Sequence, residues 1–190
     1  MWSDFMASEE RNTLKLIVSM VIANLIRLVR IIPNNDPIMS MALPYARRSS
    51  ALTSFLFPLV TMASFDFVTG YLGTWTIVTA LTYGVIGLAF HYLLKDKEKI
   101  GLFTYLKGGV AGVLAFDFIT GVVATPLLYP MSFMQAFFGQ IPFTAMHLAT
   151  TCAFILVVTP LLDKQVLLNK SLNDSEIRRM FASISSRLAL

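Results

Sequence analysis

The chain has 190 residues, of which 56% are hydrophobic and only 14% are charged, and its mean hydropathy is +0.69. This composition excludes an ordinary soluble domain, which fills its core with far fewer apolar residues, and predicts an all-α integral membrane protein. The net charge of +4 needs no nucleic-acid partner, because the basic residues of a membrane protein face anionic lipid at the cytoplasmic surface.

Six transmembrane helices are expected from the apolar runs of about 20 residues that lie between charged residues, proline, glycine or asparagine. The first is expected at residues 14–32, where the prolines of Pro33-Asn34-Asn35-Asp36-Pro37 end it. The second, at residues 38–46, is too short to cross alone and contains Pro44, so it is either an abbreviated, irregular span or a re-entrant segment. The other four are expected at residues 51–68, 74–94, 105–127 and 136–162.

The basic residues predict the orientation, because short cytoplasmic loops carry an excess of lysine and arginine. With the amino terminus inside, every lysine and arginine except Arg27 and Arg30 falls on the cytoplasmic side. We therefore expect a multi-pass protein of the cell membrane with both termini in the cytoplasm. Residues 1–165 would form one six-helix transmembrane domain, and residues 166–190 a cytoplasmic amphipathic tail.

Two near-repeats, Phe65-Asp66-Phe67-Val68-Thr69-Gly70 and Phe116-Asp117-Phe118-Ile119-Thr120-Gly121, each place one carboxylate in an apolar run. A charge at the bilayer centre costs about 2.5–3.5 kcal/mol, so each aspartate needs a partner or a task. Arg27 and Arg30 lie three residues apart on one helix face and are the candidate partners. Arg27 with Asp66 is predicted as a structural ion pair. Whether Asp66 and Asp117 bind a ligand or only pair with arginine stays open.

Polar residues recur at helical spacing on three of the expected spans. Gln140, Thr144 and His147 share one face of the last helix, at positions i, i+4 and i+7. Trp75, Thr79 and Thr82 or Tyr83 repeat the arrangement on residues 74–94, and residues 105–127 offer Asp117, Thr120 and Gly121. These faces would converge on a pocket that opens outward, with apolar and aromatic walls and a few hydrogen-bonding groups. The alternative is that the polar groups only bond the helices to one another.

Small residues mark places where helices approach closely. Ser19 and Ala23 form a small edge on the first helix, which either accepts a partner protein's helix or packs within the chain. Gly84 and Gly87 punctuate residues 74–94, and Gly108 with its neighbours opens residues 105–127. We therefore expect these two helices to pack closely against each other.

Motifs for catalysis are missing from the sequence. It contains no His-Glu-x-x-His helix, no Gly-x-Ser-x-Gly elbow and no Gly-x-x-x-x-Gly-Lys-Ser/Thr phosphate loop. The lone Cys152 excludes a thiolate metal site. We therefore expect that the chain is not an enzyme, has no catalytic residue and binds no metal or cofactor. Active uptake by this chain would need an ATPase partner.

The order of these features resembles the substrate-binding S components of energy-coupling-factor vitamin transporters. The resemblance covers about residues 12–165 and rests on the Pro-Asn-Asn-Asp-Pro break, on Trp75-Thr76-Ile77-Val78-Thr79-Ala80-Leu81-Thr82-Tyr83-Gly84, and on Gly139-Gln140-Ile141-Pro142-Phe143-Thr144-x-x-His147. It implies six helices, a site for a vitamin or related micronutrient near the outer face, and a lid loop after the first helix. It also implies a transmembrane coupling subunit and two cytoplasmic ATPase subunits as partners.

The resemblance places Asn34, Asn35 and Asp36 in the lid loop. Ser19-xxx-Ala23 stands where the family often has an Ala-xxx-Ala pair for docking the coupling subunit. The substrate-binding residues predicted in this way are Arg30, Asn34, Asn35, Trp75, Thr79, Asp117, Gln140, Thr144 and His147. The alternative function is a non-transporting membrane scaffold of a cell-envelope complex, which would keep the helices without a ligand pocket.

Overall fold

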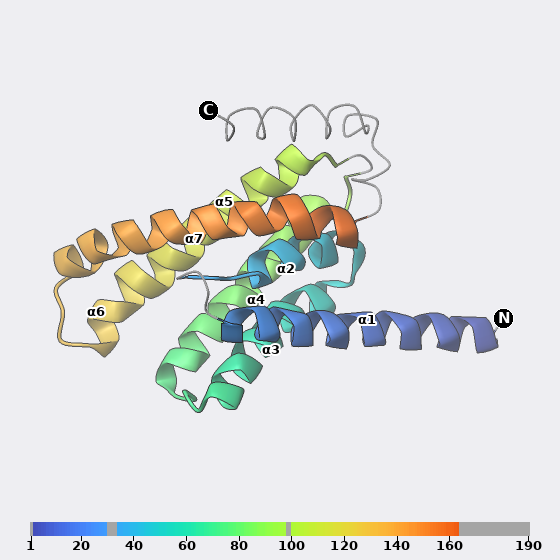
Figure 1. Cartoon of the computed structure of the whole chain (residues 1–190), viewed down its shortest axis with the longest axis horizontal. Helices are drawn as coiled ribbons and strands as arrows, with labels where there is room; N and C mark the ends of the chain where they lie inside the picture. The colour runs from blue at the N-terminus through green and yellow to red at the C-terminus, as the bar shows by residue number, and fades with distance from the viewer. Residues whose placement is uncertain (1, 30–33, 98–99, 164–190) are drawn as a thin grey trace, which may run out of the picture.

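The computed structural model describes residues 2–29, 34–97 and 100–163, with side chains from Leu14 onward. These residues form an all-α bundle (Figure 1). Its elements are α1 (Trp2–Val29), α2 (Ile38–Arg48), α3 (Ala51–Thr69), α4 (Thr74–Leu94), α5 (Leu102–Asp117), the π-helix η1 (Phe118–Ala124), α6 (Thr125–Leu128) and α7 (Phe133–Leu162). The predicted tail at 166–190 lies outside the described residues.

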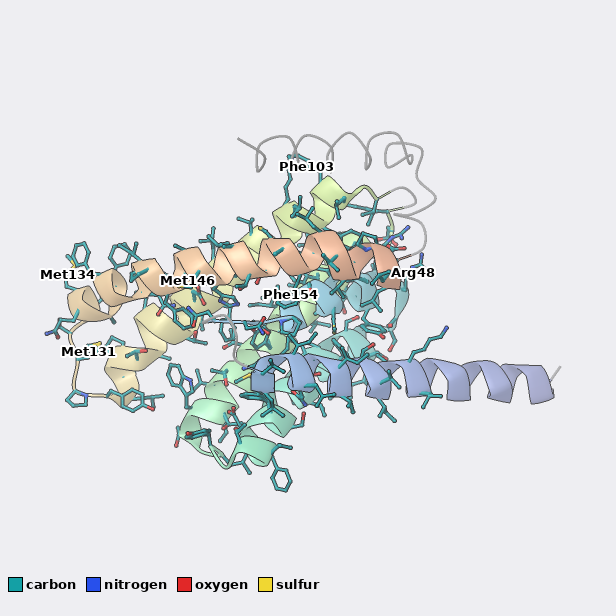
Figure 2. All side chains as sticks on the ribbon, in the orientation of Figure 1. Arg48, Phe103, Met131, Met134, Met146 and Phe154 are labelled. Carbon is teal, nitrogen blue, oxygen red and sulfur yellow. The ribbon has the colours of Figure 1, made fainter. Side chains whose placement is uncertain are left out.

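Four helical stretches of the described chain are long and apolar enough to cross a membrane: α3, α4, the continuous run Leu102–Leu128 and α7. Large apolar side chains point away from them (Figure 2), including Phe103 and Met134, which are 68% and 61% exposed. An outward apolar surface of this extent suits lipid and not water. The prediction of an all-α, multi-pass membrane protein is confirmed, whereas the count of six spans stays a prediction.

The predicted helix ends agree closely for α3 and α4, but α7 starts at Phe133, earlier than the expected 136. A capping box explains the earlier start. Gln135 N donates to Ser132 Oγ at 3.2 Å, and Ser132 N donates to Gln135 Oε1 at 2.9 Å. These two bonds satisfy amide donors that a helix start would otherwise leave unpaired.

The weak second segment is a short, buried helix. α2 has 11 residues and is about 16 Å long at 1.5 Å per residue, roughly half of the hydrocarbon thickness. Most of its side chains are buried, and it contacts α3, α4, α5 and α7. The surrounding helices therefore shield its backbone from lipid, as a re-entrant segment requires.

α1 packs along the bundle, and its amino-terminal part extends beyond the other helices (Figure 1). Ser19 Oγ lies 2.7 Å from the Tyr45 hydroxyl, Asn24 Nδ2 donates to Ser64 Oγ at 2.9 Å, and Ala23 is fully buried. Ser19 and Ala23 are therefore covered by their own chain, which agrees with the alternative that this edge packs within the chain. Their docking to a partner subunit stays a prediction.

The glycines of α4 face α3 instead of α5. A Cβ at Gly87 would lie 2.2 Å from the carbonyl oxygen of Ser54, and one at Gly84 would lie 2.9 Å from the Phe55 ring. On α5, a Cβ at Gly109 would lie 2.2 Å from Ile155 Cδ1 of α7. The α4 glycines therefore do not lie on the α5 glycines, although Gly112 of α5 does accommodate α4, since its Cβ would lie 2.6 Å from the Phe90 ring.

One end of the bundle is closed by a buried aspartate. Asp163, just after α7, accepts hydrogen bonds from Arg47 at 2.9 Å, from Arg48 and from the Tyr105 hydroxyl, and it is fully buried. Arg47 also donates to the carbonyl oxygen of Lys97 at 3.2 Å. These bonds join the end of α2 to the start of α5 and the end of α7.

Candidate functional site

A cavity of about 630 Å³ lies among α1, the 34–37 loop, α3, α4, η1 and α7. Its size is within the range of about 300–1,000 Å³ that is usual for small-molecule sites. The polar residues that line it are Arg27, Asn34, Asn35, Asp36, Thr79, Thr120, Thr125, Gln140 and His147. The aromatic residues that line it are Phe65, Trp75, Tyr83, Phe116 and Phe143.

Four ionisable side chains contact one another in a row beside this polar cavity, and they are Asp117, His147, Asp36 and Arg27. His147 Nδ1 lies 2.9 Å from Asp117 Oδ1, and His147 Nε2 lies 3.3 Å from Asp36 Oδ2. Arg27 Nη1 lies 3.6 Å from Asp36 Oδ1, which also accepts a hydrogen bond from Ile38 N at 2.9 Å. The group therefore links α1, the loop after it, α5 and α7.

The charges of this group balance if both aspartates are ionised and His147 carries both protons. An imidazole flanked by two carboxylates donates from both nitrogens only when it carries both protons, because an ionised carboxylate can only accept. Imidazolium at His147 and guanidinium at Arg27 then compensate the two aspartates, which avoids an uncompensated buried charge. For Asp36, burial raises the pKa, but the His147 hydrogen bond and the charge of Arg27 outweigh it, so the pKa is lowered from its usual 3.8.

The predicted Arg27–Asp66 ion pair is replaced by a different arrangement. Arg27 pairs with Asp36, and its guanidinium carbon lies 4.3 Å from the centre of the Phe65 ring. Asp66 Oδ2 instead accepts a hydrogen bond from Thr76 Oγ1 at 2.7 Å. The 34–37 loop brings the Asp36 carboxylate to Arg27, while Asp66 closes the turn between α3 and α4.

Most of the predicted substrate-binding residues come together in the polar cavity. Those that line it are Asn34, Asn35, Trp75, Thr79, Gln140 and His147. Asp117 contacts His147 but does not line the polar cavity. Asp117 and Thr144 both line a second cavity, at the seam between η1 and α7. Arg30 falls outside the described residues.

The loop predicted as a lid is tied to its surroundings. Asn34 Nδ2 donates to the carbonyl oxygen of Phe143 at 3.2 Å, and the Thr150 hydroxyl donates to the carbonyl oxygen of Asn34 at 2.8 Å. Asn35 Nδ2 donates to the carbonyl oxygen of Ile26 at 2.9 Å, while its buried Oδ1 has no hydrogen-bond partner among the described residues. An amide oxygen left without a donor beside a cavity is available to a ligand.

Of the residues in the aromatic wall, the sequence predicted only Trp75 and, as an alternative to Thr82, Tyr83. Tyr83 and Phe116 stack with their ring centres 4.1 Å apart, and the rings of Phe116 and Phe143 each meet His147 edge-on at 6.0 Å. Helical spacing held a signal, because Phe143 follows Gln140 by three residues and precedes His147 by four. The apolar composition of the helix hid this signal, because in the sequence an aromatic residue that lines a cavity cannot be told from one that faces lipid.

The turn that follows Asp117 is a π-helix, which sequence reasoning did not predict. Short π-helical turns inside α-helices occur often at functional sites. Here η1 carries Thr120 and Gly121 along the cavity wall. A Cβ at Gly121 would lie 2.0 Å from Gln140 Oε1, so glycine is needed for the Gln140 side chain to lie where it does.

Comparisons with known proteins give one match. No curated protein and no solved structure matches the chain. The family described as "Family of unknown function (DUF6580)" matches residues 7–165, which span α1 to α7 and every residue of the polar cavity. The chain therefore belongs to this DUF6580 family.

Proposed function

We propose that the chain is the substrate-binding subunit of an uptake system for a vitamin or related micronutrient. The observation that carries this proposal is the polar cavity of about 630 Å³ beneath the 34–37 loop. Charged, amide and aromatic side chains from distant parts of the chain converge there. A helix bundle held together only by ordinary hydrogen bonds between helices has no need of such a space.

The place of the cavity along the bundle supports capture from outside the cell. His147 lies sixteen residues before Asp163 on α7, which puts it about 24 Å from the Arg47–Asp163 end. Arg47 and Arg48 mark that end as cytoplasmic under the positive-inside rule. In the proposed six-span topology both termini lie in the cytoplasm, and the cavity lies toward the outer face of the cell membrane.

Uptake against a gradient would require partners in the proposed function, because the sequence has no phosphate-binding loop. A transmembrane coupling subunit and two cytoplasmic ATPase subunits would supply the energy. The predicted docking residues Ser19 and Ala23 are buried in their own chain. We propose no catalytic role for the chain, so it would bind its substrate without changing it.

A binding experiment tests this function. The purified chain in lipid nanodiscs is heated with each member of a panel of vitamins, and molecules retained through purification are identified by mass spectrometry. A ligand present at 100 times its Kd stabilises the folded state by about 2.7 kcal/mol. We expect one compound to raise the unfolding temperature of the wild type and of Phe138→Ala, whose side chain is 62% exposed on α7. We expect a smaller rise in Gln140→Ala.

The alternative function, a non-transporting scaffold, gives the opposite result. A scaffold would retain no small molecule, and no compound of the panel would change its unfolding temperature. That outcome would overturn the proposed function. Equal stabilisation of Gln140→Ala and Phe138→Ala would move the binding site away from the polar cavity.

A further inference from the structure

A second cavity, of about 650 Å³, lies on the opposite side of the seam between η1 and α7. Its walls are mainly apolar and include Leu114, Phe118, Phe137 and Ile141, which are 40–52% exposed on the outside of the bundle. Because these residues lie on helices that span the membrane, this apolar cavity faces the hydrocarbon of the bilayer.

Gln140 lines both cavities. Its Nε2 lies 3.5 Å from Thr144 Oγ1, at the outer limit for a hydrogen bond, and its Oε1 lies against Gly121, which has no side chain. Of the described residues it is the one that lines both cavities, so a passage between the two spaces would lead past its side chain.

Asp117 provides a polar group on the apolar side of the seam. Its Oδ1 is bonded to His147, and the residue lines the apolar cavity while only 1% of its surface is exposed. Its Oδ2 is buried and has no hydrogen-bond partner among the described residues. A carboxylate oxygen without a donor in apolar surroundings is costly, so an incoming hydroxyl or amino group would be bound favourably there.

We propose that the ligand of this site is a single-chain amphiphile that occupies both cavities. Its polar head lies in the polar cavity, its alkyl chain passes Gln140 into the apolar cavity, and a hydroxyl or amino group near the junction donates to Asp117 Oδ2. This inference rests on the proposed function, because it narrows the substrate to one with an alkyl chain. The proposal takes one alkyl chain and not the two of a phospholipid, because the two cavities share a single lining residue, Gln140.

Native tryptophan fluorescence tests the inference. The chain has two tryptophans, so Trp2→Phe leaves only Trp75, which lines the polar cavity. This variant in nanodiscs is titrated with a single-chain alkyl amine that carries a nitroxide quencher beside its amino group. Phosphatidylcholine with the same nitroxide at its head serves as the two-chain comparison. We expect saturable quenching of Trp75 by the single-chain probe and only weak, linear quenching by the phospholipid.

Two further variants on α5 separate cavity binding from contact with the protein surface. Ala115 lines the apolar cavity and Ala111 does not, although both are exposed and lie one helical turn apart. In the Trp2→Phe background, Ala115→Phe should fill the apolar cavity and weaken the single-chain probe on the order of tenfold, the equivalent of 1.4 kcal/mol. Ala111→Phe adds the same ring outside the cavity and should leave quenching unchanged.

The outcomes separate this inference from the proposed function. Equal quenching of Trp75 in Ala115→Phe and Ala111→Phe would overturn the proposal of an amphiphilic ligand. Equal quenching by the alkyl amine and by the phospholipid would overturn it as well. If a vitamin stabilises both variants equally while the alkyl probe does not quench Trp75, the inference fails and the proposed function stands. If neither class of compound binds, both fail.

Discussion

Asp117 and His147, thirty residues apart in the chain, meet inside the bundle, where Asp117 Oδ1 lies 2.9 Å from His147 Nδ1. This contact fixes the orientation of the imidazole ring, so that its second nitrogen, Nε2, points at Asp36 in the loop after α1. The loop is thereby connected to the middle of two membrane-spanning helices. A ligand that contacts Asp36 or His147 would act on the loop, α5 and α7 together.

Asp36→Asn should destabilise the protein strongly. Removing one partner from a buried ion pair typically costs about 3–5 kcal/mol, because the remaining charges lose their compensation. Here Arg27 and His147 would keep their positive charges opposite a single carboxylate, Asp117. Thermal unfolding in nanodiscs measures the loss. Asp96→Asn is the control, because Asp96 is exposed, and its effect should stay within about 0.5 kcal/mol. Equal stability of the two variants would contradict the ion-pair interpretation.

The stability gap between the wild type and Asp36→Asn should depend on pH. The folded pKa of Asp36 is lowered from 3.8, by the His147 hydrogen bond and the Arg27 charge acting against burial. A lowered pKa contributes stability that is complete above the unfolded value and is lost as the pH falls through the folded one. Unfolding temperatures of both proteins should therefore differ by a constant amount well above the unfolded pKa of 3.8 and converge as the pH falls through the lower folded pKa. A gap that widens on acidification would mean that Asp36 is protonated in the fold.

Hydropathy predicted the membrane-spanning helices well because lipid imposes both their length and their ends. The predicted ranges 51–68 and 74–94 agree with α3 and α4 to within a residue, since proline, glycine and charge bound them. Helical spacing located Gln140 and His147, because polar groups within apolar runs are few and conspicuous, whereas Asn34 and Asn35 were predicted from the family resemblance. Depth in the bilayer and helical spacing are properties of the local sequence.

The pairing of those groups could not be predicted in the same way. A similar depth in the bilayer made Asp66 a suitable partner for Arg27. The direction in which each helix face turns depends on packing, however, and in the structure Arg27 pairs with Asp36. Asp36 was expected in the lid loop, and its burial depends on how the 34–37 loop packs against the bundle. The π-helical turn after Asp117 likewise has no signature in the spacing of its residues.

Gly121→Ala should weaken ligand binding with little loss of folded protein. The new methyl group would lie 2.0 Å from Gln140 Oε1, and this flexible side chain would move away to relieve the contact. The amide would then leave its position in the wall of the polar cavity. Gly139→Ala is the matched control, because its Cβ would meet nothing within 4 Å although it adjoins Gln140. The affinity of any compound found in the vitamin panel measures the effect. Equal affinity in both variants would remove Gln140 from the site.

Gly87→Ala should instead disrupt the bundle itself. Its Cβ would lie 2.2 Å from the backbone carbonyl oxygen of Ser54, and a backbone atom cannot rotate away as the Gln140 side chain can. α3 and α4 would have to separate, and such overpacking typically costs about 1–3 kcal/mol, occasionally more. Gly139→Ala is again the comparison, and there alanine should stabilise the helix by roughly 0.5–1 kcal/mol. Thermal unfolding of the two variants should therefore change in opposite directions. A Gly87→Ala protein as stable as the wild type would mean that α3 and α4 do not pack backbone to backbone at Ser54.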